Sequence, residues 1–359
     1  MNYLTVIMLV FSLLGAVDRI FGNRFGLGKE FERAFMLLGT MALSMIGMIV
    51  ISPLIAELMK PVSVFMGNTL GIDSSIIPAS LFANDMGGAP LAVEMASNQK
   101  TGLYNALVVS SMMGCTVSFT IPFALGVVDK QHHRELLLGL LCGIVTIPIG
   151  SFVAGLICGM PLMGLVVDLI PLIVFSAIIA LGLVLFPEMC VKIFKVFGIF
   201  ITVVITIGLA LGIIRFLTGY EVVKGLATLE EGASICVNAA VVLSGSFPLM
   251  HFISKVLSKP LEFAGSKLGI NKYSAVGIIS SLASSSATFG MTGKMDKKGI
   301  VLNSAFAVSG AFVLGSHLAF TMAFDASYIF PVIAGKLIAG VLAVLLSVVV
   351  YKRTNKEKE

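Results

Sequence analysis

The chain is organised as a series of long apolar runs separated by short polar loops. Nine runs of about 20 or more residues are each long enough to cross the hydrocarbon core of a bilayer. These runs lie at 2–21, 33–58, 102–127, 134–158, 164–186, 190–217, 230–257, 299–324 and 329–351. The pattern predicts an all-α polytopic membrane protein with about nine crossing helices. Arg19 follows the first run and no basic stretch precedes it, which predicts a retained membrane helix rather than a cleaved secretory signal.

Two further segments are apolar at both ends and polar in the middle. The first, near 74–97, contains NDMGGAP from Asn84 to Pro90, and the second, near 273–293, contains SSSATFG from Ser284 to Gly290. Glycine, proline and side chains that compete for backbone hydrogen bonds disfavour a continuous helix. Each segment therefore predicts a broken or re-entrant helical hairpin, and such backbone at membrane depth must be buried in protein or line a cavity.

The distribution of Lys and Arg favours hairpins over crossing segments. If both broken segments return to their own side, the cytoplasmic loops hold about 19 of the 24 basic residues and the outer loops about 4. Crossing segments would leave about 9 basic residues outside. The sequence therefore predicts an N-terminus outside and a cytoplasmic tail at 352–359.

The sequence also contains an internal repeat. KPVSVFMGNTLGID at 60–73 is echoed by KPLEFAGSKLGIN at 259–271, each directly before a broken segment. Three polar positions recur at a constant offset: Asn105, Ser111 and Ser118 match Asn303, Ser309 and Ser316. We predict two inverted repeats, 1–158 and 188–351, joined by a linker helix at 159–187. In secondary transporters with this architecture the substrate site lies near the midplane, where broken helices meet.

Composition narrows the class of protein. The chain has 57% hydrophobic and 12% charged residues and a mean hydropathy of +1.04. This composition excludes a soluble enzyme. The net charge of +5 comes from basic residues scattered singly, which argues against a nucleic-acid partner and for contact with membrane lipid. The sequence contains no HExxH, GxSxG or P-loop motif and no cysteine or histidine cluster at metal spacing. It predicts no enzymatic activity, no cofactor and no metal.

Asp85 is the leading candidate for a binding residue. A carboxylate beside a break deep in the membrane is energetically expensive unless it has a functional partner. It would bind a cation or a proton, and the neighbouring Asn84 offers both a donor and an acceptor. The alternative role is a cap on a half-helix. Because the second break has no acidic counterpart, the site is anionic and suits a small organic cation.

The other candidates flank the two breaks or recur in the repeat. They are Gly87, Gly88, Glu94, Asn105, Ser284, Ser285, Ser286, Thr288 and Asn303. The hydroxyls either bind a polar solute or satisfy unwound backbone. Glu94 either gathers cations at the outer mouth or is simply solvated. Asn105 and Asn303 either bind substrate or join helices. We expect Asp168 and Lys336 to form an ion pair near the outer helix ends, and His317 to be a hydrogen-bonded helix residue or a proton relay.

At LFANDMGGAPLAVEMA and SSLASSSATFGMTGKMDKKG the chain resembles the ethanolamine-utilisation transporter family (EutH) of bacterial inner membranes, over nearly its whole length. The resemblance implies import of ethanolamine across the cytoplasmic membrane without enzymatic activity. Ethanolamine, like other alkyl ammonium ions, is mostly protonated at neutral pH. Asp85 would pair with its ammonium group, while Asn84 or the serines take its hydroxyl.

Two alternatives remain beside this interpretation. One is a proton- or sodium-coupled symporter for another small polar metabolite, such as a nucleoside or an amino acid. The other is a membrane scaffold or sensor that transports nothing. Small residues at helical spacing, Gly155 with Gly159 and Gly208 with Gly212, permit close helix packing within the subunit or in a homo-oligomer.

Overall fold

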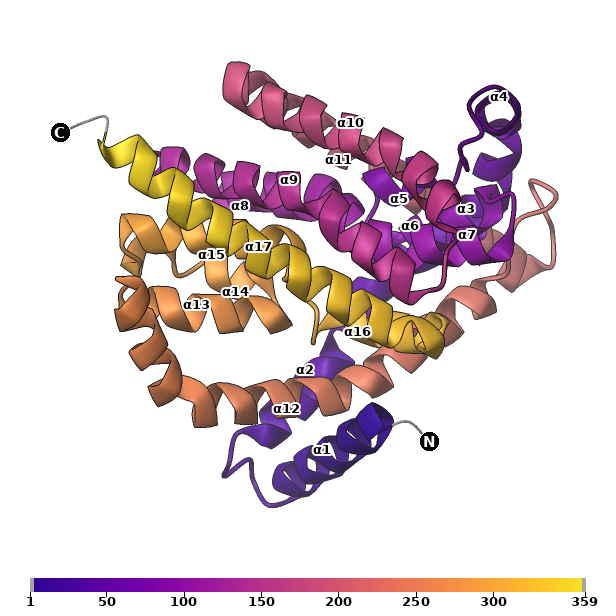
Figure 1. Ribbon diagram of the computed structural model, residues 1–359. Helices are drawn as coiled ribbons and strands as arrows, with labels where there is room; N and C mark the ends of the chain where they lie inside the picture. The colour runs from indigo at the N-terminus through magenta and orange to yellow at the C-terminus, as the bar shows by residue number, and fades with distance from the viewer. Residues whose placement is uncertain (1–2, 357–359) are drawn as a thin grey trace.

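The computed structural model describes the backbone of residues 3–356, without the side chains at 191, 257–266, 355 and 356. Most of the second copy of the KP echo therefore lies outside the described side chains. Within the described backbone all regular structure is helical (Figure 1). Eight segments are long and apolar enough to cross a membrane: Tyr3–Ile20, Leu27–Leu58, Gln99–Val127, Lys130–Ile157, Leu162–Leu185, Pro187–Thr218, Leu229–Val256 and Ala326–Thr354. The prediction of an all-α polytopic membrane protein is confirmed.

The predicted first repeat runs through nine helices and a series of short tighter or wider turns. The helices are α1 (Tyr3–Ile20), α2 (Leu27–Met36), α3 (Leu38–Leu58), α4 (Lys60–Phe65), α5 (Ile76–Leu81), α6 (Gly88–Met95), α7 (Gln99–Tyr104), α8 (Ile121–Val127) and α9 (His133–Ile157). Three π-helical stretches cover Met66–Leu70, Asn105–Gly114 and Thr116–Thr120, and 3₁₀ turns cover Asn84–Met86 and Lys130–His132. Helix α7, two of the π-helical stretches and α8 together form one long crossing segment, 99–127.

The linker and the predicted second repeat supply the remaining helices. These are α10 (Leu162–Leu185), α11 (Pro187–Thr218), α12 (Leu229–Leu268), α13 (Lys272–Ala283), α14 (Ser285–Phe289), α15 (Lys297–Ser309), α16 (Ser316–Phe324) and α17 (Ile329–Lys356), with 3₁₀ turns at Thr292–Lys294 and Ala326–Tyr328. Helices α9 and α17 run side by side, and α15 packs against both (Figure 1). Helix α1 packs against α12, and α11 packs against α3.

The first glycine of each small-residue pair packs against another helix of the same subunit. A Cβ atom on Gly155 would lie 2.4 Å from Cδ1 of Leu165, where α9 meets α10. One on Gly208 would lie 2.1 Å from the carbonyl oxygen of Gly47, where α11 meets α3. These glycines bring helices of one chain into close contact. Both positions are therefore occupied by contacts within the chain, and the homo-oligomer stays a prediction.

The first broken segment is a hairpin whose two ends meet at one carboxylate. Asp73 Oδ1 accepts hydrogen bonds from the backbone N of Ser75 at 3.0 Å and from its hydroxyl at 2.5 Å. Asp73 Oδ2 accepts in the same way from Ser97, at 3.0 Å and 2.5 Å. Ser75 at the start of the segment and Ser97 at its end thus bind the same side chain. The chain therefore returns to the side from which it entered, as a re-entrant hairpin does.

We expect Asp73→Ala to destabilise the fold by releasing both ends of the first hairpin. The substitution removes four hydrogen bonds from a buried carboxylate, and bonds to a charged group contribute about 1.5–3 kcal/mol each when their partners are left unsatisfied. The thermal unfolding temperature of the purified protein should fall clearly. Asp129→Ala, at an exposed loop position, is the matched control and should leave it unchanged. Equal unfolding temperatures for both variants would contradict this role.

The second broken segment is closed by a similar device. Asp296 Oδ1 accepts from the backbone N of Asn271 at 2.8 Å and from the Ser274 hydroxyl at 2.7 Å, so the hairpin again begins and ends at one place. Asn98 and Asp296 cap the helices that follow the two hairpins, and they are separated by the same number of residues as Asn105 and Asn303. Asn98 Oδ1 accepts from the backbone N of Thr101 at 2.9 Å, and Asp296 Oδ2 accepts from that of Gly299 at 3.2 Å. The duplication itself stays a prediction.

The predicted crossing helix 299–324 is wrong as a continuous helix. It consists of α15 and α16 with non-helical backbone between Gly310 and Gly315, where Phe312 has φ +60°. The break exists because the backbone N of Phe312 donates to Ser281 O at 2.9 Å and that of Leu314 donates to Leu282 O at 2.8 Å. Both carbonyls lie in the last turn of α13, so the non-helical stretch is hydrogen-bonded to the second hairpin.

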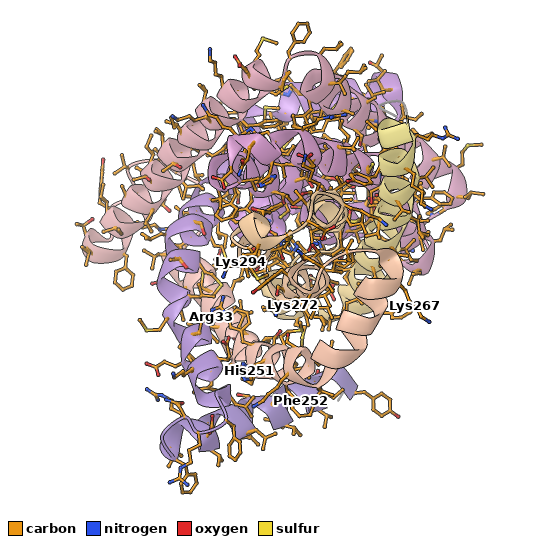
Figure 2. The ribbon with its side chains drawn as sticks, turned by 90° about the vertical axis from the view of Figure 1, so that its left-hand side faces the viewer. Arg33, His251, Phe252, Lys267, Lys272 and Lys294 are labelled. Atoms are coloured by element: carbon orange, nitrogen blue, oxygen red, sulfur yellow. The ribbon has the colours of Figure 1, made fainter. Side chains whose placement is uncertain are left out.

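Basic side chains gather at one end of the helix bundle. Figure 2 views this end and shows Arg33, Lys267, Lys272 and Lys294, which come from α2, α12, α13 and the turn after α14. All of them belong to loops or helix ends that the sequence assigns to the cytoplasmic side.

Candidate functional site

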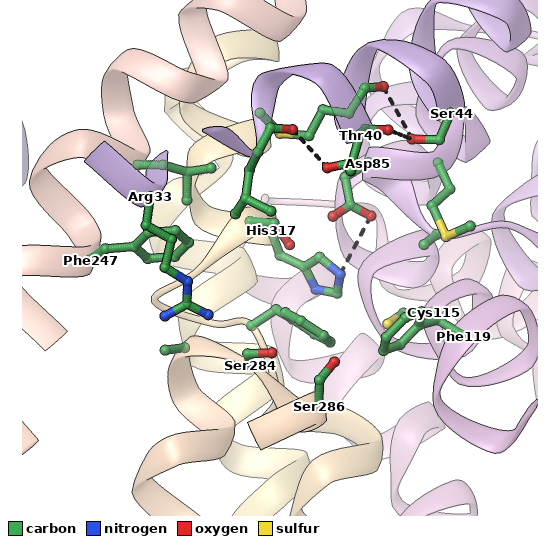
Figure 3. Close-up of a pocket in the computed structure, with 18 residues that line it drawn as sticks. Arg33, Thr40, Ser44, Asp85, Cys115, Phe119, Phe247, Ser284, Ser286 and His317 are labelled. Carbon is green, nitrogen blue, oxygen red and sulfur yellow. Dashed lines mark hydrogen bonds and ion pairs between the residues drawn. The ribbon is translucent and has the colours of Figure 1, made fainter. Parts of the chain in front are cut away.

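A cavity of about 390 Å³ lies where the tips of the two hairpins face each other (Figure 3). Its wall is formed by side chains from several helices and from both hairpin tips. Among the lining residues are Arg33, Thr40 and Ser44 from α2 and α3, Asp85 from the first tip, Cys115 and Phe119 from the segment 99–127, Phe247 from α12, Ser284 and Ser286 from the second tip, and Ser316 and His317 from α16. The arrangement brings together polar groups that are far apart in the sequence.

The first tip positions Asp85 by interrupting the helix just before it. Phe82 and Ala83 are extended, and the carbonyl of Phe82 and the N–H of Ala83 bond to the next crossing segment. The Ser110 hydroxyl donates to Phe82 O at 2.6 Å, and the backbone N of Ala83 donates to the Ser118 hydroxyl at 3.1 Å. Serines thus satisfy the opened backbone, and Asp85 projects from the following 3₁₀ turn toward the cavity.

The glycines of this tip are required for packing. Gly87 has φ +90°, a conformation that favours glycine, and a Cβ there would lie 2.0 Å from Cγ of Met48. A Cβ on Gly88 would lie 2.3 Å from Phe82 O. Both residues therefore let the tip fit against its neighbours, and neither lines the cavity.

Of the four residues predicted at the second tip, two line the cavity and two are buried in the core. Ser284 is extended, and it lines the cavity together with Ser286. The Thr288 hydroxyl is buried and donates to Gly277 O at 2.8 Å, so it holds the tip to α13. Ser285 is fully buried, and its hydroxyl has no hydrogen-bond partner among the described residues.

Asp85 faces a buried histidine and, beyond it, a buried lysine. His317 Nε2 lies 3.8 Å from Asp85 Oδ1, and Lys336 Nζ lies 3.1 Å from His317 Nδ1. The side chains of His317 and Lys336 are each 1% exposed, whereas that of Asp85 is 18% exposed and reaches the cavity. The predicted ion pair between Asp168 and Lys336 is wrong. Asp168 lies on the linker helix α10 and accepts a bond from the backbone N of Asp73 at 3.1 Å.

The remaining sequence candidates lie outside the cavity wall. Asn84 is fully buried, and neither polar atom of its amide has a partner among the described residues. The Nδ2 atom of Asn105 donates to the Ser75 hydroxyl at 2.8 Å, and that of Asn303 donates to Ser274 O at 2.8 Å, so both amides join a hairpin to the next helix. Glu94 lines a separate cavity of about 490 Å³ with Glu57 and Lys60.

Several lining residues are not marked by any local pattern, and Arg33 and Cys115 are among them. The guanidinium of Arg33 lies 5.0 Å from the ring centroid of Phe247 and 3.1 Å from Glu30 Oε2 at the edge of the cavity. Cys115 lies within an apolar run, and apart from its sulfur nothing in the sequence distinguishes it. In the part of the chain that the structure describes, no group of three or more His, Cys, Asp or Glu side chains is suited to a metal.

Comparison with known proteins gives a consistent family. A family model described as "Ethanolamine utilisation protein, EutH" matches residues 1–350. The chain is similar to the "Probable ethanolamine permease EutH" of Listeria monocytogenes, with 43% identity over 98% of this chain and 95% of the relative. Proteins of the same name from Salmonella typhimurium and Escherichia coli are each 38% identical over 94% of this chain and 92% of the relative. No solved structure matches the chain.

Proposed function

Because this chain belongs to the EutH family of ethanolamine utilisation proteins and is a multi-pass membrane transporter, we propose that it carries ethanolamine across the bacterial cytoplasmic membrane and catalyses no reaction. The names of its relatives support the substrate. The observation that carries the proposal is Asp85, a carboxylate exposed to a cavity between two re-entrant tips.

The polar groups of the cavity match the two ends of ethanolamine. The ammonium group binds the Asp85 carboxylate, because a charge-assisted hydrogen bond at a partly buried site is strong and short. The hydroxyl group binds Ser284 or Ser286 on the opposite tip, since a serine hydroxyl both donates and accepts. A substrate held in this way bridges the two predicted repeats, and binding is then sensitive to their relative movement.

We infer that the cavity faces the cytoplasmic side in this conformation. It extends from Asp85 to Arg33, and Arg33 belongs to the end of the bundle where basic side chains gather (Figure 2). The N-terminus then lies outside and the tail inside. Inverted repeats open a midplane site to each side in turn by exchanging their conformations, so an outward-open state completes the cycle.

The proposal predicts a distinctive order of competitors in liposomes that contain the purified protein. Uptake of labelled ethanolamine should saturate and should be inhibited by ethylamine, which keeps the ammonium group. Ethylene glycol, which keeps only hydroxyl groups, should inhibit at least about 10-fold less well, because the charged contact contributes more than about 1.4 kcal/mol. Inhibition by nucleosides or neutral amino acids in place of ethylamine would favour another substrate.

Replacement of Ser284 and Ser286 by alanine is expected to affect only the hydroxyl end of the substrate. The loss of one neutral hydrogen bond, worth about 1 kcal/mol, should raise the apparent KM for ethanolamine about fivefold. Ethylamine has no hydroxyl group and therefore no such contact to lose. Its inhibition constant is the internal control and should stay the same. An equal loss for both amines would show that the serines act on the fold of the tip.

A further inference from the structure

Three ionisable side chains form a continuous buried row that begins at the cavity. Lys336 Nζ donates to Ser111 O at 2.6 Å and lies 3.1 Å from His317 Nδ1, and His317 Nε2 lies 3.8 Å from Asp85 Oδ1 (Figure 3). The three residues come from α17, α16 and the first tip, so the row joins the last crossing helix to the hairpin that carries the carboxylate.

The hydrogen bonds of Lys336 fix the orientation of protons in the row. An ammonium group has donors only, so Nδ1 of His317 accepts its bond, and the histidine proton is on Nε2, facing Asp85. The row then holds one negative and one positive charge, separated by a neutral imidazole. Among the described residues, the other charged or titratable side chains that line the same cavity are Cys115 and, at its edge, Arg33.

Binding of a protonated amine disturbs this balance. The substrate ammonium at Asp85 would leave the ammonium of Lys336 as a second positive charge beside a single carboxylate, at a depth where uncompensated charge is expensive. The charge can be balanced again if one proton leaves. Lysine can release its proton, whereas arginine in proteins stays charged.

We propose that the protein exchanges each amine cation for one proton, which Lys336 releases through His317 when the substrate occupies Asp85. An N–H bond of Lys336 breaks as one forms at His317 Nδ1, and the proton on His317 Nε2 passes to water in the cavity. Release of the substrate on the other side reverses these transfers. This inference rests on the proposed function, and it makes both the empty and the loaded carrier neutral, so transport moves no net charge.

The proton count of binding tests the proposal on the full-length protein. Ethanolammonium chloride is titrated calorimetrically into purified protein at neutral pH, in two buffers of different ionisation enthalpy. Wild type should release one proton per bound cation. Lys336→Met should bind with no proton released, and Lys336→Arg, which keeps the charge, should bind more weakly and also release none. Wild-type binding with no proton released, or the same release from wild type and Lys336→Met, would overturn the proposal.

Transport under a membrane potential supplies the second readout. With a potassium diffusion potential of about 100 mV, negative inside, Lys336→Met should accumulate labelled ethanolamine up to about 50-fold, because each cycle then carries one charge. Wild type should not accumulate it. Liposomes without protein correct for diffusion of the neutral amine. Wild-type accumulation driven by the potential would overturn the exchange proposal alone, whereas absence of any ethanolamine binding would overturn the permease proposal and the exchange with it.

Discussion

Asp85→Asn is expected to abolish saturable ethanolamine uptake. The substitution preserves the size of the side chain and removes the only carboxylate that lines the cavity among the described residues. A substrate ammonium would then lie in a partly buried site without a countercharge, and an unpaired buried charge costs about 3–5 kcal/mol. The apparent affinity should therefore fall by at least about 100-fold.

Asp129→Asn is the matched control for this experiment, since Asp129 is exposed in the loop before α9 and its variant carries the same chemical change. Both variants are compared with wild type for uptake of labelled ethanolamine and for thermal unfolding. If Asp85→Asn folds normally and takes up ethanolamine with the wild-type KM, the carboxylate is not the ammonium site.

Gly114→Ala is expected to cause a large loss of stability and, with it, of transport. A Cβ atom at this position would lie 1.9 Å from Phe82 O and 2.6 Å from Ala79 O, and both oxygens belong to the backbone of the first hairpin. Backbone cannot move aside as a flexible side chain can, so the expected cost is about 3 kcal/mol or more. The displaced segment is the one that holds Asp85 at the cavity.

Gly126→Ala tests whether the effect depends on that contact. Gly126 lies on the same crossing segment, in α8, and a Cβ there would meet nothing within 4 Å. Its unfolding temperature and uptake should match those of wild type, or its stability should rise slightly because alanine favours a helix. Similar losses in both variants would show that the segment tolerates no change at all, and would contradict the specific role of the close approach.

The sequence predicts the broken hairpins well because their signals are local. In an apolar surrounding, Asn84 to Pro90 and Ser284 to Gly290 combine residues that interrupt helices with polar groups that need partners. The break between Gly310 and Gly315 was missed for the opposite reason. Its residues are apolar and fit a crossing helix, and the hydrogen bonds from Phe312 and Leu314 to the end of α13 are long-range contacts that no local pattern reveals.

The candidate site was predicted in part. Asp85, Ser284 and Ser286 line one cavity because each stands beside a break, whereas Thr288 on the same tip is turned toward α13. The position of Lys336 was misjudged, because the sequence determines neither the depth of a helix residue nor which side of the helix faces the core. An ionisable residue within an apolar run is nevertheless a signal of function, and it applied to Lys336 as well as to His317.

A structure determined by electron cryomicroscopy with bound ethanolamine would test the central claim most directly. The account predicts the ammonium nitrogen at roughly 3 Å from a carboxylate oxygen of Asp85, with the hydroxyl group directed toward Ser284 or Ser286. Ethanolamine bound elsewhere, for example in the cavity lined by Glu94, with Asp85 left in contact with His317 alone, would contradict it.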